Sequence, residues 1–423
     1  MVKRRRGPSF THLGGLRAVA LAIGVAVAAA ALGAAGTAVA QPKEVKVALI
    51  GPLSGPWARQ GKLMQLGADL AIEDINTQGG IKALGGAKLR LVVLDAGDSA
   101  EKAKNAAQRL VAQEPDVVGG TGAWLSSFTL AITEVTERAK LPWLTLSYSD
   151  LITERGFEYV FQTSATAGTQ ARNALPSLME LAEKATGKRP TTVGIISDNT
   201  ASPISFMKPM REGGLAKLGL KLVVDEIFTP PLSDATPLVQ KVRSARPEFM
   251  LMLPTNVPDV SLVLQKLKEF GLTRDRLPLI GNGAQLGSPD LLNTVGKELL
   301  EGMMSIVANW PIKGQEELAE RFKKRTNEPF MTQDSISVYG EIWILKEALE
   351  KAGTADRAKV AAAIRAMDTT TGAARYFPGG RMKWEKNGRR AGASIVVFQW
   401  QGGRPVTVYP LESAAGTARW TKR

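Results

Sequence analysis

Apolar and polar positions along this chain alternate with two periods, one typical of strands and the other of helices. Val45–Leu49 alternates apolar with small or polar residues, as a strand does. After it, apolar residues recur at helical spacing until Gly79-Gly80 ends the pattern: Met64, Ala68, Ala71 and Ile75. The same analysis predicts a strand at Leu89–Leu94, a helix at Ala100–Gln113, a strand at Val117-Val118, a helix at Ser126–Lys140 and a strand at Trp143–Leu146. Repeated strand–helix steps of this kind predict a parallel sheet with right-handed crossovers.

A second series of the same kind starts near residue 190. It predicts strands at Thr192–Ser197, Lys221–Phe228, Phe249–Leu253 and Pro278–Ile280, and helices at Ser205–Leu218, Thr236–Ala245, Pro258–Phe270 and Pro289–Leu300. No motif recurs at a fixed period, so the pattern predicts two similar α/β lobes and not a solenoid.

The last part of the chain has a different pattern. Ser335–Ala352 is amphipathic over its whole length and predicts one long helix. Arg375–Trp384 and Ser394–Trp400 are expected to be antiparallel strands around the turn Lys386-Asn387-Gly388. From Glu412 onward small and polar residues predict a flexible tail, residues 412–423.

The first forty residues read as a secretion signal. Met1–Arg6 is basic, Ala18–Ala35 is an almost uncharged apolar stretch, and Ala38-Val39-Ala40 is a cleavage pattern, so residues 1–40 are a predicted signal peptide cut before Gln41. A membrane anchor is the weaker alternative, because Ala and Gly partition poorly into hydrocarbon. The residues after Arg4-Arg5-Arg6 match a twin-arginine signal poorly, which favours Sec export and leaves the other route open.

After this leader the chain has no histidine and no cysteine, since the one histidine is His12. Without imidazole or thiol there is no Ser-His or Cys-His relay and no usual zinc ligand set. The absence of cysteine also excludes a lipid anchor on the N-terminus. An exported protein without an anchor would be lost from a cell with a single membrane, so we expect it to be in a periplasm. We therefore expect a binding protein and not an enzyme, with no cofactor and no metal.

Two further motifs have ordinary structural explanations. The glycine-rich stretch Gly281–Gly287 resembles a dinucleotide loop but is one residue too long, and we interpret it as a turn at the end of a strand. Asp95, Asp98 and Glu101 lack the glycine and final glutamate of a calcium loop, and we interpret them as a strand end and a helix cap.

The charge balance adds little to this picture. The full chain has a net charge of +14, but the leader carries five of the 54 Lys and Arg residues and no acid, so 49 against 40 leaves +9. The basic residues are scattered, which favours a solvated surface over an anionic ligand or a membrane surface, and no nucleic acid partner is expected.

Several segments, in order, resemble one protein family. The opening Val47–Pro56 (VALIGPLSGP), Glu73–Asn76 with Gly79-Gly80-Ile81, Leu94-Asp95-Ala96, Leu141-Pro142, Phe157–Gln162, Trp384–Gly388 and Val397–Trp400 are similar to the leucine/isoleucine/valine-binding proteins of ABC importers. The resemblance runs from Val45 to Pro410.

The resemblance implies a type I periplasmic binding fold, in which two Rossmann-like lobes joined by three chain crossings close on a ligand. Lobe one would be residues 41–162 with 309–388, and lobe two 163–308 with 389–411. The expected partners are a small carboxylate and the permease subunits of an importer, and the protein would be a monomer. A periplasmic sensor that presents the ligand to a receptor is the alternative.

The resemblance also assigns candidate ligand-binding residues. Ser126 and Ser149 occupy the positions whose hydroxyls hold the ligand carboxylate, with helix N-termini supplying N–H groups. The remaining candidates lie in neighbouring loops or at lobe-two positions of the family: Trp57, Trp124, Ser127, Tyr148, Ser202 and Asn282. The alternative for each serine is a helix cap, and for Trp57 and Trp124 a cover of a lobe surface.

This chain departs from the family where an amino acid's ammonium group would bind. The two acidic positions align with Ala167 and Gly283, so either Asp198 or Asp259 serves instead or the ligand has no amine. An aromatic or aliphatic acid is then an alternative to an amino acid, because a buried ammonium without a counter-charge is unfavourable.

Overall fold

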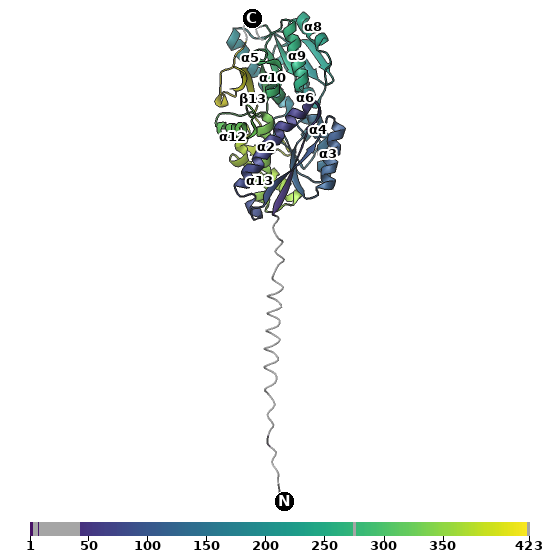
Figure 1. Ribbon diagram of the computed structural model, residues 1–423, viewed down its shortest axis with the longest axis vertical. Coiled ribbons are helices and arrows are strands. Elements are labelled where there is room, and N and C mark those ends of the chain that lie inside the picture. Colours follow the sequence, from purple (N-terminus) through teal and green to yellow (C-terminus); the bar gives the residue numbers. More distant parts are fainter. Residues whose placement is uncertain (3–6, 8–42, 274–275, 421–423) are drawn as a thin grey trace. The chain divides into compact units, whose positions relative to one another are not determined.

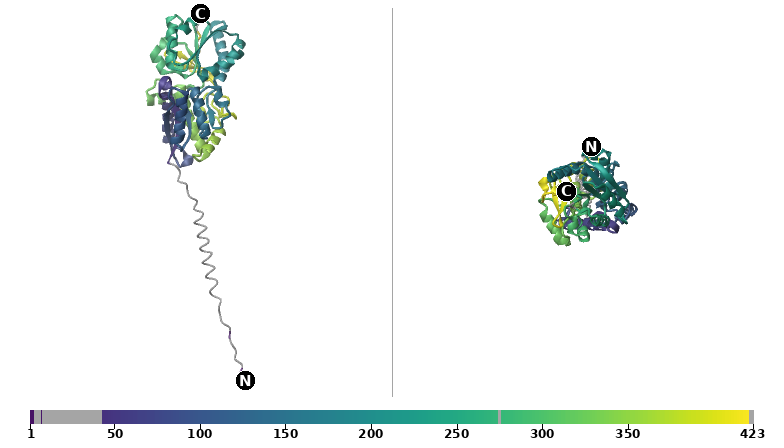
Figure 2. Two further views of the ribbon diagram at one scale, coloured as in Figure 1. Left: turned by 90° about the vertical axis from the view of Figure 1, so that its right-hand side faces the viewer. Right: turned by 90° about the horizontal axis from the view of Figure 1, so that it is seen from above.

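The computed structural model describes residues 1–2, 7, 43–273 and 276–420, and nearly all of the predicted signal peptide lies outside this range. Two α/β lobes make up the chain from residue 43 onward, each around its own sheet (Figures 1 and 2). Among the described residues, no helix combines the length and the apolar character needed to cross a membrane.

Lobe one contains a sheet of five strands in the order β2-β1-β3-β4-β5, all parallel to their neighbours. The strands are β1 (Glu44–Gly51), β2 (Lys88–Asp95), β3 (Val117–Gly122), β4 (Trp143–Thr145) and β5 (Val160–Gln162). The predicted short strand at Val117-Val118 therefore continues through the glycines that follow it. Parallel pairing requires a crossover after each strand, which explains the strand–helix rhythm of the sequence.

Helices cover both faces of this sheet. On one face α2 (Ala58–Thr77) lies beside α13 (Gln333–Ala352), and on the other lie α3 (Ala100–Gln113) and α4 (Ser126–Arg138) (Figure 1). The four apolar residues predicted to form the inner face of α2 are all buried. Two further helices, α12 (Glu316–Thr326) and α14 (Arg357–Arg365), join the α13 side.

Lobe two contains a sheet of seven strands in the order β14-β13-β10-β9-β8-β6-β7. The strands are β6 (Thr192–Asp198), β7 (Lys221–Phe228), β8 (Phe249–Leu253), β9 (Leu279–Asn282), β10 (Met304–Val307), β13 (Val396–Gln401) and β14 (Arg404–Tyr409). The first five are parallel, while β13 is antiparallel to both β10 and β14.

Two predicted helices of lobe two are interrupted. The helix expected at Ser205–Leu218 begins earlier and divides into α6 (Ala201–Pro209), a wide turn at Met210–Gly214 and α7 (Leu215–Lys217). The helix expected at Pro289–Leu300 divides at Gly296 into α10 (Pro289–Val295) and α11 (Lys297–Leu300). The other helices of this lobe are α5 (Ala167–Thr186), α8 (Thr236–Ala245) and α9 (Val257–Glu269).

The predicted hairpin around Lys386-Asn387-Gly388 is wrong. That turn joins only the single bridge between Trp384 and Arg390. The long hairpin is β13–β14, which turns at Gly402-Gly403 with φ of 62° and 82°. Two residues with positive φ match the twist of an antiparallel pair, and glycine adopts this conformation without steric cost. Residues 368–369 (β11) and 382–383 (β12) form a separate two-stranded ladder.

Residues 412–420 of the predicted flexible tail make defined contacts with lobe two. The Gln399 side chain donates to the Arg419 carbonyl at 2.6 Å and accepts from the Arg419 N–H at 2.9 Å. The ring of Trp420 packs edge-on against Phe249 at 6.1 Å. The small residues of this segment allow it to lie close to β13; residues 421–423 lie outside the described range.

Two of the segments that connect the lobes run side by side. Gln162 at the end of β5 donates its N–H to the Gly388 carbonyl at 2.8 Å, and its carbonyl accepts from the Arg390 N–H at 3.0 Å. These two connecting segments are therefore held to each other by backbone hydrogen bonds.

Candidate functional site

A small cavity lies between the two lobes. Its lobe-one wall consists of Trp124, Leu125, Ser126, Leu146, Tyr148 and Gln333. Its lobe-two wall consists of Ser202, Thr255, Asn282, Gly283, Ala284 and Gln285. Most of these residues follow the carboxyl ends of parallel strands, where α/β sheets form their binding sites. The cavity has a volume of about 30 Å³, room for about one water molecule, so the lobes are nearly closed on each other.

Ser126 begins α4 at this cavity. Its Oγ accepts hydrogen bonds from the N–H groups of Tyr148 and Ser149, at 3.1 and 3.0 Å. Both acceptor positions of the hydroxyl are therefore used, and its proton is left to donate. The N-terminus of a helix of 13 residues adds its own positive dipole end at the same place.

Trp124 is held against the cavity by a buried carboxyl group. Its indole N–H donates to Asp334 Oδ1 at 2.7 Å, and its φ is 51°, an uncommon conformation for a bulky residue. Burial raises the pKa of Asp334 to about 7, although the hydrogen bond from Trp124 acts in the opposite direction. The indole ring therefore has a defined position in the cavity wall.

The amide orientation of Gln333 is set by the backbone. Its Oε1 accepts from the N–H groups of Ala308 and Asn309 at 3.0 and 3.2 Å, and from the Tyr148 hydroxyl. Backbone N–H groups only donate, so the oxygen must face them and the Nε2 group is the other end of the amide. Burial raises the pKa of Tyr148, so its hydroxyl stays protonated.

The side-chain amides of Asn282 and Gln285 have the opposite orientation to that of Gln333, with the nitrogen bonded to the protein. Asn282 Nδ2 donates to the Ile306 carbonyl at 2.9 Å and to Gln170 Oε1 at 2.8 Å. Gln285 Nε2 donates to the carbonyl of Pro254 at 2.7 Å and to that of Asn282 at 3.1 Å. Carbonyl groups only accept, so the nitrogen ends of both amides are fixed toward protein. Neither amide oxygen accepts a hydrogen bond from the part of the chain that the structure describes.

The N-terminus of α6 faces that of α4 across the cavity. The Ala201 N–H donates to Ser127 Oγ at 3.3 Å, a bond between the lobes, and Ser202 follows it in the cavity wall. Two helix N-termini thus converge on one region, which favours a negatively charged group there.

Five of the eight candidate residues line the cavity: Trp124, Ser126, Tyr148, Ser202 and Asn282. The other three, Trp57, Ser127 and Ser149, do not. Trp57 is buried in lobe one with its ring edge-on to Phe128 at 5.6 Å. Ser149 Oγ shares a hydrogen bond of 2.9 Å with Ser205 of lobe two. The ligand roles of all eight remain predictions.

The two aspartates considered as partners of a ligand ammonium group already accept hydrogen bonds from the protein. Asp198 accepts four hydrogen bonds from the backbone and hydroxyls of Thr200 and Thr255, between 2.6 and 2.9 Å. Asp259 accepts from the Leu232 N–H and the Asn256 side chain. Neither residue lines the cavity, and every residue that does line it is uncharged.

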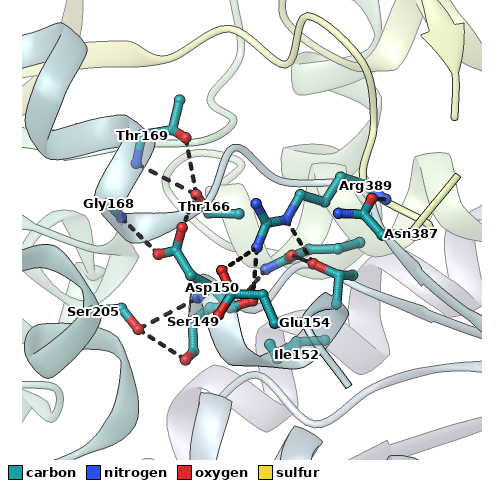
Figure 3. A network of polar contacts seen from close by, with 12 residues as sticks. Ser149, Asp150, Ile152, Glu154, Thr166, Gly168, Thr169, Ser205, Asn387 and Arg389 are labelled. Carbon is teal, nitrogen blue, oxygen red and sulfur yellow. Dashed lines mark hydrogen bonds and ion pairs between the residues drawn. The ribbon is translucent and has the colours of Figure 1, made fainter. Parts of the chain in front are cut away.

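Beside Ser149, a polar network joins the lobes at the connecting segments (Figure 3). The Asp150 carboxylate accepts from the Thr166 hydroxyl at 2.7 Å and the Gly168 N–H at 2.9 Å, at the start of α5. Arg389 donates to the Asp150 carbonyl at 2.8 Å and to Glu154 at 3.1 Å. The negative charge of Asp150 at the N-terminus of α5 stabilises this junction.

A further contact between the lobes is an ion pair of Arg59. Arg59 in α2 makes an ion pair with Asp290 at the start of α10. Its guanidinium also donates two parallel hydrogen bonds to the Glu328 carboxylate, at 2.9 and 2.5 Å. The first bond joins lobe one to lobe two, so it exists only when the lobes are close.

Sequence reasoning missed Thr255, Gln285 and Gln333. Thr255 and Gln285 come after lobe-two strands, a position that does signal a site, whereas Gln333 begins a helix and carries no such signal. Asp95 ends β2 as expected and accepts from the Leu53 and Gly97 N–H groups. The cap of α3 is Ser99, which accepts from the Lys102 N–H, and not Asp98 or Glu101.

The chain is similar to known proteins over most of its length. A family model described as periplasmic binding protein matches residues 44–404. The Leu/Ile/Val-binding protein homolog 7 of Brucella melitensis biotype 1 is 29% identical over 406 residues, 94% of this chain and 98% of that protein.

Solved structures share the fold. A leucine-binding protein from Thermotoga maritima MSB8 has a TM-score of 0.71 and 22% identity, covering 86% of this chain and 97% of its own. A solute-binding protein of an ABC transporter from Rhodopseudomonas palustris BisB5, in complex with 3,4-dihydroxybenzoic acid, has a TM-score of 0.71 and 21% identity, covering 86% and 95%. The predicted fold class, two α/β lobes of the type I periplasmic binding protein fold, is confirmed.

Proposed function

The chain belongs to the periplasmic binding protein family, and from this premise we propose that it captures a small carboxylate between its lobes as the solute-binding component of an ABC importer. Membership in this family indicates a binding role in transport and not catalysis. The named relatives include a leucine-binding protein and a binder of an aromatic acid, so the family alone leaves the ligand open.

The observation that carries the proposal is the convergence of two helix N-termini on a cavity lined by uncharged residues. The start of α4 and the start of α6 both present N–H groups and positive dipole ends, and Ser126 has a hydroxyl proton to donate. A carboxylate accepts such bonds without a cation, as anions do at helix N-termini. The cavity is small, so capture requires the lobes to part and close again around the ligand.

The same lining favours an acid without an amine. The ammonium group of an amino acid would face only neutral side chains, and Asp198 and Asp259 are already bonded elsewhere. Removing that charge from water without a counter-charge costs about 2 kcal/mol or more. We therefore propose an aromatic or aliphatic monocarboxylate as the ligand class.

Titration calorimetry on a matched pair tests the ligand class. Leucine and 4-methylpentanoate differ only in the amine, and benzoate adds an aromatic acid. We expect the two acids to bind and leucine to bind at least tenfold more weakly. Tighter binding of leucine would refute the exclusion of an amine, while the capture of a carboxylate would stand.

Two serine variants test the carboxylate position. Ser126→Ala should weaken binding of the best acid by tenfold or more, because a charge-assisted hydrogen bond contributes about 1.5–3 kcal/mol. Ser99→Ala is the matched control, since Ser99 caps a helix of the same lobe and does not line the cavity. Equal affinities of the two variants would show that the carboxylate binds elsewhere.

We also propose that residues 1–40 are removed on export to the periplasm and that the lobe boundaries follow the crossings near residues 162, 308 and 388. Sequencing the N-terminus of the protein recovered from a periplasmic extract tests the first point. A start at Gln41 is expected, and an intact Met1 would contradict it.

A further inference from the structure

Away from the start of α6, the cavity has opposite hydrogen-bonding character on its two walls. On the lobe-one side the groups left for a ligand are donors: the Ser126 hydroxyl proton and the Gln333 Nε2 group. On the lobe-two side they are acceptors: Asn282 Oδ1 and Gln285 Oε1. Backbone groups fix all three amides, so this polarity does not depend on an arbitrary choice of amide orientation.

A third lobe-two group adds to the same pattern. Thr255 donates its hydroxyl proton to Asp198 Oδ2 at 2.6 Å, so only lone pairs remain on its oxygen. Asp198 is also bonded by the Thr255 N–H at 2.7 Å, which holds the residue in place in the cavity wall. The lobe-two wall therefore presents oxygen acceptors and no committed donor among its oriented side chains.

Gly283 makes room for this arrangement. Its φ is 121°, and a Cβ atom at this position would lie 2.2 Å from Gln285 Oε1. The Gln285 amide oxygen thus occupies space that any other residue at 283 would fill, which makes its position a consequence of the local sequence.

These acceptors exclude several kinds of ligand end. A second carboxylate only accepts and would face lone pairs with lone pairs. An ammonium group would be charged in an uncharged cavity. An apolar end would leave two buried amide oxygens without a partner once water is expelled. A hydroxyl group donates a proton, remains neutral and satisfies the wall.

We propose, building on the proposed function, that the ligand carries a hydroxyl group at the end opposite its carboxylate, and that Asn282 and Gln285 receive this hydroxyl. The ligand class is then a hydroxy-substituted monocarboxylic acid. The starts of α4 and α6 hold the acid group and the lobe-two amides select the hydroxyl, so full affinity requires both ends of the ligand and closure of the lobes.

Calorimetry on matched ligand pairs tests this on the unmodified mature protein. Each hydroxylated acid is paired with its fluoro analogue, which has a similar size and no proton to donate: 3- and 4-hydroxybenzoate and 4-hydroxyphenylacetate. Because the site would be left with unpaired acceptors, we expect the best hydroxylated acid to bind at least tenfold more tightly than its fluoro partner. Terephthalate, with a carboxylate at both ends, should give no measurable heat.

A variant adds an independent readout. Gln285→Met removes the amide oxygen at nearly constant length, and the hydroxyl-to-fluoro affinity ratio should fall to below threefold. If the variant does not fold, the ligand pairs measured on the unmodified protein still decide the question.

The outcomes separate the two proposals. Equal affinities within every pair would overturn the hydroxyl assignment and leave carboxylate capture standing. Binding of leucine with no binding of any acid would overturn the amine-free ligand class and the hydroxyl assignment together. Absence of heat with all of these compounds would overturn both proposals.

Discussion

Glu341 offers a test of how burial controls this protein's stability. It lies on α13 and is fully buried, with Oε1 accepting from the Thr163 hydroxyl at 2.6 Å and Oε2 from the Thr121 hydroxyl. Burial raises the pKa of Glu341 to about 7, and the two hydroxyls only partly oppose this. Glu341→Gln keeps the shape and one acceptor while removing the ionisable group.

The magnitude follows from the shift in pKa. Between pH 4.5, the ordinary pKa of a glutamate, and about pH 7, Glu341 holds a proton in the folded state that it has lost in the unfolded state. The contribution of Glu341 to stability is therefore largest below pH 4.5 and decreases by about 3 kcal/mol as the pH rises through 7. Asp334 shifts in the same direction to about 7, so its contribution has the same sign.

Urea unfolding at pH 5, 6, 7 and 8, followed by tryptophan fluorescence, measures the effect. The free energy of unfolding of the unmodified protein should fall across this range. The free energy of unfolding of Glu341→Gln should fall by about 2.5 kcal/mol less over this range, and the variant should exceed the unmodified protein in stability at pH 8. Glu158→Gln, which removes one carboxyl group from a peripheral loop, is the control and should retain the full decrease.

Two results would refute the reasoning. One is a Glu341→Gln variant whose stability decreases with pH as steeply as that of the unmodified protein. The other is an unmodified protein whose stability does not change between pH 5 and pH 8.

Three further variants probe closure, the cavity wall and the tail. Asp290→Asn breaks the ion pair with Arg59 that joins the lobes; because both groups are partly exposed, about 0.5–1 kcal/mol and a two- to fivefold weaker affinity in calorimetry are expected. Gly283→Ala forces a Cβ atom against Gln285 Oε1 and should weaken acid binding by at least tenfold. Trp420→Ala removes an aromatic pair and should lower the free energy of unfolding by about 1 kcal/mol.

Matched controls separate these effects from general damage. Gly219→Ala shares a positive φ of 73° but has no neighbour within 4 Å, so it should leave affinity unchanged. Asp368→Asn breaks exposed ion pairs within lobe one, to Arg381 and Lys383, and should not alter ligand affinity. If a control changes affinity as much as its partner variant, the site-specific explanation fails. A Trp420→Ala protein of unchanged stability would contradict the packing role of the tail.

Hydrophobic periodicity predicted best those elements that bury a single apolar face. α3 has the same bounds in the sequence prediction and in the structure, Ala100–Gln113, because its apolar stripe and its capping Ser99 are both local signals. The hairpin at the end of the chain was predicted around the wrong turn. The choice between Lys386–Gly388 and Gly402-Gly403 depends on which strand β10 pairs with, and this is a long-range contact.

The candidate site divides in the same way. Ser126 and Tyr148 follow strands of a recognisable lobe, and their place at the cavity was predictable from strand order and family resemblance. Gln333 lies more than 180 residues from Tyr148, yet its amide oxygen binds both the Tyr148 hydroxyl and the backbone of residues 308–309. No spacing in the sequence indicates such a contact.

The amino-acid sequence by itself determined the two-lobed α/β architecture and the exclusion of thiol chemistry, because these follow from local periodicity and composition. Only the tertiary structure decided which side chains form the cavity wall and which end of each amide faces it. The reason is that an amide is oriented by whichever backbone donors or acceptors lie beside it, and these come from distant segments brought together by the packing of two lobes.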